Sequence, residues 1–217
     1  DYSQGCREGF YLLDAWAGEL LEQGEADGLD LSLQGYGSRF ILCGDGPAPA
    51  GLSRARDLFE GVQPEDLALR PWDLSGLDAD LPGGALELAD QVLGDWREDE
   101  TLAAALSRVA YSTRFVVEQA GPVRLELGAL RGAVAVELDG EPVGAILIPP
   151  HALDLGELAA GPHELRLLFT PPWRNGLLAL AADGDPAYAQ FEGKEDTRIP
   201  SGLFGPASLR CASCSLP

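Results

Sequence analysis

The stretch Val134-Ala135-Val136-Glu137-Leu138-Asp139-Gly140-Glu141-Pro142-Val143 decides the fold class of this chain. Its first five residues put three apolar side chains on one face of an extended strand, because successive side chains of a strand point to opposite faces. Asp139-Gly140 follows at once and is a preferred two-residue turn between antiparallel strands. The stretch therefore predicts a β-hairpin whose second arm runs to Ile148.

Runs with the same alternation recur on both sides of this hairpin. In His163–Phe169, for example, Leu165, Leu167 and Phe169 share one face. The strands predicted in this part of the chain are Val109–Glu118, Val123–Leu127, Ala133–Leu138, Val143–Ile148, His163–Phe169, Leu177–Ala181 and Ala207–Cys211. Short strands at this spacing, separated by Gly and Pro turns, predict two packed antiparallel sheets, which makes the fold class all-β.

The chain divides into three parts by composition. Residues 1–44 read as the closing strands of a small, partial β-sandwich: Phe10–Leu13, Glu19–Glu22, Leu29–Leu33 and Ser38–Cys43. Four short strands bury too little apolar area to stand alone, so we expect their partner strands upstream. Residues 45–94 read as a Gly- and Pro-rich linker and an irregular entry segment, in which Leu67–Leu74 and Ala85–Leu93 are either edge strands or irregular. Residues 95–217 read as the second domain. Within it, helical spacing of apolar residues predicts one short helix at Glu98–Arg108.

The charge of the chain bears on its partners. Thirty-five acidic residues against 15 basic ones give a formal net charge of −20, which repels a phosphate backbone and argues against nucleic-acid binding. No apolar run approaches the roughly 20 residues of a membrane helix, so we expect no membrane partner. The charge favours solubility. Its other interpretation is a structural Ca²⁺ site, for which Asp183, Asp185, Glu192, Glu195 and Asp196 are the candidates.

The four cysteines are Cys6, Cys43, Cys211 and Cys214. Only the last two have the spacing of a metal-ligand pair, so a zinc site is a weak interpretation. Cys43 ends the apolar run Phe40-Ile41-Leu42 and reads either as a buried small hydrophobe or as half of a disulfide. The sequence does not decide between these states, and it leaves the compartment of the protein open.

Taken in order, several motifs resemble one known family. They are Tyr111-Ser112-Thr113-Arg114-Phe115, Leu125-Glu126-Leu127-Gly128, Val136–Gly144, Pro149-Pro150-His151, Trp173-Arg174-Asn175 and Ser201–Pro206. Together they resemble the galactose-binding-like (sugar-binding) jelly roll of glycoside hydrolase family 2 and of family 106 α-L-rhamnosidases. Pro149-Pro150-His151 departs from the family's usual "P-Y". The segment Leu13–Glu19 is similar to the "D-P-W-T-G-E" of the small sandwich that precedes this domain, with Ala15 and Ala17 as departures.

The resemblance implies that the chain is the C-terminal region of a multidomain glycoside hydrolase. In these families a barrel domain supplies the catalytic acids, and no βα alternation in this chain could build a barrel. We therefore expect no independent catalysis, no cofactor, and packing against an upstream catalytic domain of the same enzyme. A Ser-His-Asp triad is also not predicted, because no Gly-x-Ser-x-Gly turn accompanies His151 or His163.

Carbohydrate binding is the more specific of two functional interpretations. An aromatic face stacks on a sugar ring while Arg or Asn bonds its hydroxyls, and Trp173, Arg174 and Asn175 offer that chemistry in one loop. His151, in the loop after two prolines, is a further candidate. Trp96 reads as a packing anchor. The alternative is a structural or protein-interaction module with no sugar ligand, in which Trp173 covers the core and Asn175 bonds the backbone of a turn.

Overall fold

The computed structural model describes residues 9–15, 19–24, 38–44, 58–66 and 71–212. The chain forms two compact units, residues 1–60 and 61–217. The predicted strand Leu29–Leu33 lies outside the described residues, as do Cys6, Cys214 and residues 45–57 at the start of the linker region.

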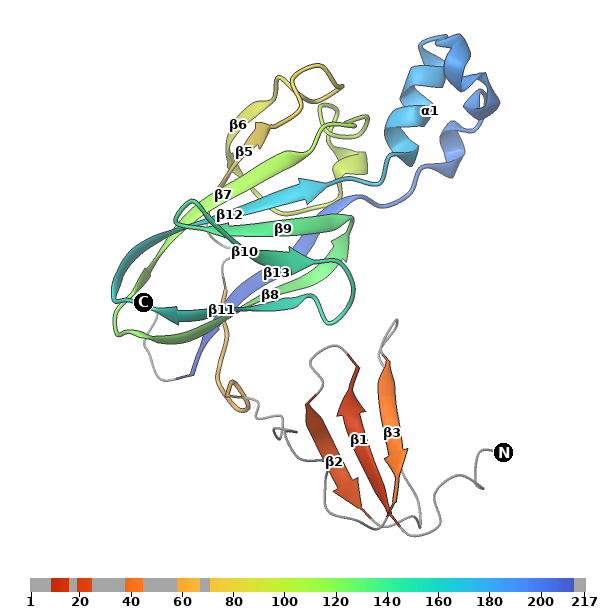
Figure 1. The fold of residues 1–217 in the computed structure, drawn as a ribbon. Helices are drawn as coiled ribbons and strands as arrows, with labels where there is room; N and C mark the ends of the chain where they lie inside the picture. Colours follow the sequence, from red (N-terminus) through yellow and green to blue (C-terminus); the bar gives the residue numbers. More distant parts are fainter. Residues whose placement is uncertain (1–8, 16–18, 25–37, 45–57, 67–70, 213–217) are drawn as a thin grey trace. The chain divides into compact units, whose positions relative to one another are not determined.

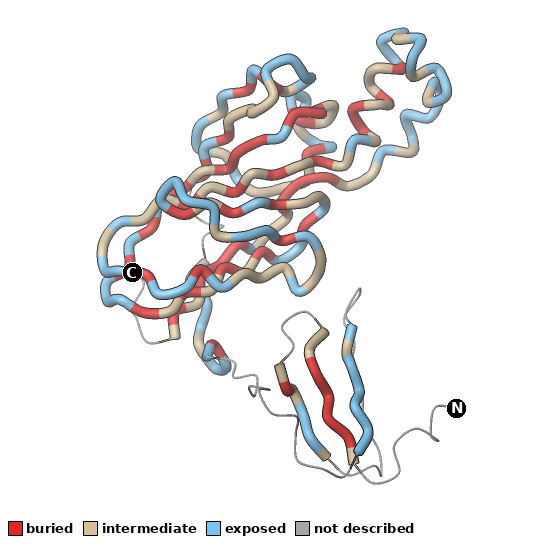
Figure 2. The backbone as a smooth tube through the Cα atoms, viewed as in Figure 1, coloured by how far each residue is buried: buried red, intermediate tan, exposed pale blue. Residues whose placement is uncertain are grey.

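The first unit contains a three-stranded antiparallel sheet in the order β2-β1-β3 (Figure 1). Its strands are β1 (Phe10–Asp14), β2 (Leu20–Gly24) and β3 (Arg39–Cys43). The central strand β1 is buried along almost its whole length, whereas β3 is mostly exposed (Figure 2). Three of the four strands predicted for this region are therefore confirmed.

The second unit is a β-sandwich of two antiparallel sheets (Figure 1). The six-stranded sheet has the order β10-β9-β12-β7-β5-β6, and the four-stranded sheet has the order β11-β8-β13-β4. The strands are β4 (Glu65–Asp66), β5 (Trp72–Gly76), β6 (Glu87–Gln91), β7 (Val109–Val117), β8 (Gly121–Arg131), β9 (Ala133–Leu138), β10 (Glu141–Ile146), β11 (Ala152–Leu158), β12 (Gly161–Thr170) and β13 (Gly202–Cys211). The prediction of an all-β sandwich is confirmed.

Alternation along the strands builds the core between the sheets. The buried positions of β8, which include Val123, Leu125 and Leu127, alternate with half-buried ones. On β12, Leu165 and Leu167 are fully buried and belong to the same cluster. The interior of the sandwich is thus filled by apolar side chains from both sheets, and their removal from water is the main force that stabilises the unit.

The predicted hairpin is the β9–β10 pair. Leu138 pairs with Glu141, which leaves Asp139 and Gly140 as the two turn residues. Their φ angles of 53° and 85° are both positive, as a two-residue turn matched to the strand twist requires. Asp is one of the few non-glycine residues that adopt this conformation readily, and the side chain of Asp139 also accepts the backbone N–H of Glu164 on β12 at 2.8 Å.

An aromatic cluster closes one end of the core. The indole of Trp96 donates from Nε1 to the hydroxyl of Tyr111 at 2.5 Å. The ring of Phe169 meets Trp96 edge-on with a centroid separation of 4.7 Å, and Trp72 meets Tyr111 edge-on at 6.3 Å. Burial raises the pKa of Tyr111 far above its ordinary value, against the effect of the hydrogen bond from Trp96, so this hydroxyl stays neutral. Trp96 is therefore a packing anchor, as the sequence predicted.

The predicted helix Glu98–Arg108 is wrong. A short 3₁₀ helix, η1 (Trp96–Glu98), is followed by turns. The backbone N–H groups of Leu106 and Ser107 donate to the carbonyl of Pro82 instead of to the preceding helical turn. Arg108, which the helix interpretation placed beside a helix C-terminus, forms an ion pair with Asp78 at 2.6 Å and holds the pKa of that carboxyl near 2. Contacts distant in sequence replace the local pattern here.

The predicted strand Leu177–Ala181 is also wrong, because residues Arg174–Ala182 form the helix α1. A short apolar run is compatible with either structure. This run consists of Leu and Ala, the strongest helix formers, and has no β-branched residue. The strand β11, at Ala152–Leu158, was not predicted. Among the described residues no helix has the length and apolar character needed to cross a bilayer.

Truncation of a side chain between the sheets tests this description of the core. Leu167→Ala removes a fully buried side chain and should lower the free energy of unfolding by about 2–5 kcal/mol, measured by urea denaturation. The control is Val116→Ala on β7, whose side chain is 43% exposed, and we expect a change within about 0.5 kcal/mol. Equal losses from the two variants would contradict the assigned faces of the sheet.

Candidate functional site

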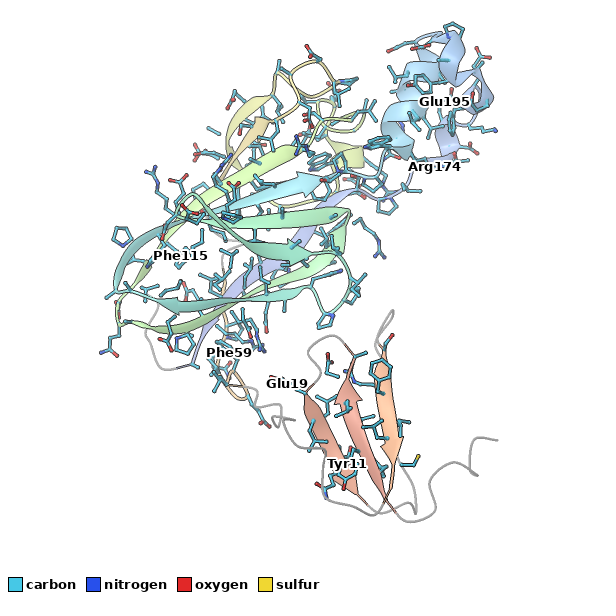
Figure 3. The ribbon with its side chains drawn as sticks, in the orientation of Figure 1. Tyr11, Glu19, Phe59, Phe115, Arg174 and Glu195 are labelled. Carbon is cyan, nitrogen blue, oxygen red and sulfur yellow. The ribbon has the colours of Figure 1, made fainter. Side chains whose placement is uncertain are left out.

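The residues predicted to bind carbohydrate lie in a helical excursion, which we define as residues 173–200, between β12 and β13. It contains α1 and two 3₁₀ helices, η2 (Pro186–Phe191) and η3 (Glu195–Thr197). In Figure 3, Arg174 lies where the excursion leaves the sheets, and Glu195 lies in its outer part. The excursion is thus a lobe attached to one end of the sandwich (Figure 1).

Trp173 is the exposed aromatic residue of this excursion. It occupies the N-cap position of α1, and its carbonyl accepts the N–H of Leu177 at 2.9 Å. Its side chain belongs to the large apolar residues left in solvent, with 63% of the residue exposed. A ligand could therefore reach the indole without displacing any part of the fold. Trp72 and Trp96, at 0% and 3% exposed, offer no such face.

Arg174 and Asn175 bond the protein itself. Arg174 donates to Thr197 twice, from Nε to the backbone carbonyl at 2.9 Å and from Nη2 to Oγ1 at 2.5 Å. Asn175 is buried, donates from Nδ2 to the carbonyl of Ile199 at 2.8 Å and accepts the N–H of Ile199 at 2.9 Å. We call these bonds the excursion clamp, because they tie the start of the excursion to its end.

His151 also forms hydrogen bonds within the protein, and its partners lie on the four-stranded sheet. Its Nδ1 lies 2.9 Å from the carbonyl of Gly128 on β8, and its own carbonyl accepts the N–H of Leu127 at 2.7 Å. Within the described part of the chain, no hydrogen bond or ion pair joins His151 to Trp173, Arg174 or Asn175. The structure thus brings the three residues of the loop together and leaves His151 apart from them.

The acidic residues proposed for calcium are distributed over the excursion. Asp185 accepts the N–H of Ala187 at 2.9 Å and so caps η2. Lys194, in the middle of the acidic run, donates to the carbonyl of Gln190. Nowhere in the described ranges do three His, Cys, Asp or Glu side chains gather closely enough to hold a metal ion. The structural Ca²⁺ site stays an untested prediction.

Both described cysteines, Cys43 and Cys211, are disulfide-bonded. The disulfide alternative for Cys43 is therefore confirmed, and the alternative of a buried small hydrophobe is wrong because Cys43 lies on the exposed strand β3. A sulfur in a disulfide has no thiolate to offer a metal, which removes the basis for a zinc site made of all four cysteines.

His163 connects the hairpin turn to β12. Its Nδ1 lies 2.7 Å from Oδ2 of Asp139, its Nε2 lies 2.8 Å from the carbonyl of Ala159, and its ring stacks on Phe115. Burial alone would lower the pKa of His163, but the two acceptors outweigh burial and raise it. The backbone N–H of Glu164, together with His163, lowers the pKa of Asp139. Because both ring nitrogens of His163 face acceptors, the charged imidazolium fits this position best. His163 therefore has a structural role.

A solved rhamnosidase structure contains a region with a similar fold. A rhamnosidase from Novosphingobium sp. PP1Y matches 94% of this chain with a TM-score of 0.61 and 22% sequence identity. Two GH2 β-galacturonidase structures from Eisenbergiella tayi, bound to galacturonate and to glycerol, match 49% and 69% of the chain with TM-scores of 0.41 and 0.47 and identities of 22% and 17%. The chain spans 20%, 19% and 24% of the length of these three proteins. No protein-family model and no curated protein matches the sequence.

The excursion clamp can be tested at Asn175. Asn175→Ala leaves the N–H and the carbonyl of Ile199 without their partner, and we expect a loss of about 1–3 kcal/mol in the free energy of unfolding. The amide of Ile199 should also exchange with deuterium faster. Asn175→Asp keeps the acceptor but places a buried carboxylate against the carbonyl of Ile199, so at neutral pH it should destabilise the unit at least as much as alanine does. Unchanged exchange at Ile199 in the alanine variant would contradict the clamp.

The pairing of His163 predicts a pH dependence of stability. A raised pKa in the folded state means that the contribution of His163 is fully present below the unfolded pKa of about 6.5 and is lost as the pH rises through the folded pKa. The difference in unfolding free energy between the native protein and His163→Gln should therefore shrink from acidic to alkaline pH. Asp139→Asn, which can still accept the N–H of Glu164, should flatten the same profile. A pH-independent difference would refute the pairing.

Proposed function

We propose that this chain is a non-catalytic accessory region of a glycoside hydrolase related to α-L-rhamnosidases. Its second unit is a galactose-binding-like jelly roll that packs on an upstream catalytic domain and contributes to carbohydrate recognition. The observation that carries the proposal is the extent of the structural likeness to the Novosphingobium rhamnosidase, which includes 94% of this chain and only 20% of that one. A region of that size leaves most of such an enzyme, including a catalytic domain, to other residues.

The packing of the sandwich supports a non-catalytic role. Hydrolysis of a glycosidic bond uses two carboxyl groups about 5 to 9 Å apart across the bond. The space between the two sheets is filled by side chains such as Leu125, Leu165 and Leu167, so no substrate reaches the centre of this unit. The proposal therefore assigns the chemistry to the catalytic domain.

Exposure of Trp173 supports the carbohydrate role. A flat indole in solvent, fixed at the start of α1, is suited to stack on the C–H face of a sugar ring. Arg174 and Asn175 act in this proposal through the clamp that holds the loop, since their polar groups already bond Thr197 and Ile199. The proposed recognition thus rests on one stacking residue on a preorganised loop.

A structural module without a sugar ligand is the second candidate. The observation that favours it is the same clamp, because it engages Arg174 and Asn175, two of the four residues expected to contact a sugar. In that case Trp173 would contact the catalytic domain instead of a carbohydrate. Exposed aromatic residues are common anchors of protein interfaces.

Calorimetric titration with rhamnose- and galactose-containing oligosaccharides separates the two candidates. We expect binding that weakens by about tenfold or more in Trp173→Ala, a loss of roughly 1.4 kcal/mol. The matched control is Leu147→Ala, which shortens another large apolar residue that is 64% exposed and should leave the affinity unchanged. No heat with any of these sugars would favour the structural module. Hydrolysis of aryl glycosides by the purified chain would overturn the accessory role.

A further inference from the structure

A shallow polar pocket lies on the outer face of the six-stranded sheet, away from Trp173. Its volume is about 350 Å³, within the usual range for small-molecule sites. We call it the outer-face pocket and define it by Pro71, Asp73, Asp90, Ser112, Arg114 and Glu164. These residues lie on or beside four strands. The four strands are successive neighbours in the sheet, in the order β12-β7-β5-β6.

Strand alternation explains why polar groups meet at this face. On β5, Trp72 and Leu74 are buried in the core, so Asp73 between them points to the outer face. On β7, Ser112 and Arg114 alternate in the same way with buried neighbours. The pocket is therefore built on paired strands, which hold side chains more rigidly than loops do.

A β-bulge brings a second carboxylate to the pocket. Leu74 pairs with Leu88 and Trp72 pairs with Gln91, so Ala89 and Asp90 together stand opposite Asp73. Without the extra residue, Asp90 would share the inward face of Leu88. With it, Asp90 adopts a φ of 55° and lines the outer-face pocket beside Asp73, whose Oδ1 lies 3.4 Å from the N–H of Asp90.

The described lining of the pocket has more carboxylates, Asp73, Asp90 and Glu164, than cations, of which Arg114 is the one it contains. Glu164 and Arg114 form an ion pair at 3.4 Å. Among the described residues, Asp73 and Asp90 have no Lys, Arg or His within ion-pair distance. Two carboxylates on adjacent strands repel each other. A ligand that covers them removes them from water, which is unfavourable unless the ligand supplies positive charge.

We propose that the outer-face pocket binds a small, hydroxyl-bearing amine, of which an amino sugar is the type. The ammonium group lies against Asp73 and Asp90, and the hydroxyls bond Ser112 and the Arg114–Glu164 pair, which together offer donors and acceptors. A neutral sugar leaves the two carboxylates uncompensated, and an acidic sugar is repelled by them. The site is independent of the role proposed for Trp173.

The test uses the whole chain and two probes that share a pyranose ring and differ at C2, where one carries a protonated amine and the other a neutral acetamide. D-glucosamine at about pH 6, where its amine is protonated, should shift the backbone amide resonances of β5, β6 and β7 in a saturable way. N-acetyl-D-glucosamine has the same ring without the charge and should bind about tenfold more weakly or worse. Equal binding of the two probes, or no saturable shift with glucosamine up to about 20 mM, overturns the proposal.

Variants locate the charge requirement. Asp73→Asn and Asp90→Asn should each weaken glucosamine binding by about tenfold, and neither removes a buried hydrogen bond, so both should fold. Glu87→Gln makes the same change in net charge on β6 outside the pocket and should leave binding unchanged. An equal effect of Glu87→Gln would show a general charge effect and overturn the site. Trp173→Ala should leave glucosamine binding intact, so this proposal and the one at Trp173 can fail separately.

Discussion

The second unit depends on the contact between Trp96 and Tyr111. One hydrogen bond and a set of ring contacts connect η1, in a segment with little regular structure, to β7 and β12 at the centre of the six-stranded sheet. Burial of Tyr111 makes the bond matter, because a hydroxyl removed from water needs a partner inside the protein. Through this contact the irregular residues before β7 cover one end of the core. The backbone carbonyl of Ser201, which directly follows the excursion, accepts the N–H of Trp96.

Sequence patterns predicted the parts of the fold that depend on neighbours in the chain. The strands around His163–Phe169 and the turn at Asp139-Gly140 were predicted because one face of each strand is buried and because the turn needs residues that accept positive φ. The helix expected at Glu98–Arg108 failed because Pro82 and Asp78, distant in sequence, take the hydrogen bonds that a helix would have used. The strand expected at Leu177–Ala181 failed because a short run of Leu and Ala does not distinguish the two structures.

The chemistry of the candidate sites was harder to predict than the fold. Trp173, Arg174 and Asn175 were selected for their side-chain groups, but the partners that engage two of them, Thr197 and Ile199, lie more than twenty residues later and follow no local pattern. The outer-face pocket could not be predicted either. Its residues come from four strands, and Asp90 reaches it through a bulge that shifts the pairing register between β5 and β6. The signals available in the sequence were the polar residues Ser112, Arg114 and Glu164, which alternate with apolar residues on two of the predicted strands.

The excursion clamp has a consequence for how this region can diverge. Arg174 and Asn175 fasten both ends of a lobe at its base, so the geometry of the neighbouring strands does not depend on what lies between. Insertions, deletions or wholesale exchange of residues 183–196 would be absorbed outside the sandwich, much as surface loops tolerate changes in length at small entropic cost. The sequence of the lobe can therefore change, in evolution or by design, to form a new contact surface while the β-sandwich beneath it keeps its structure.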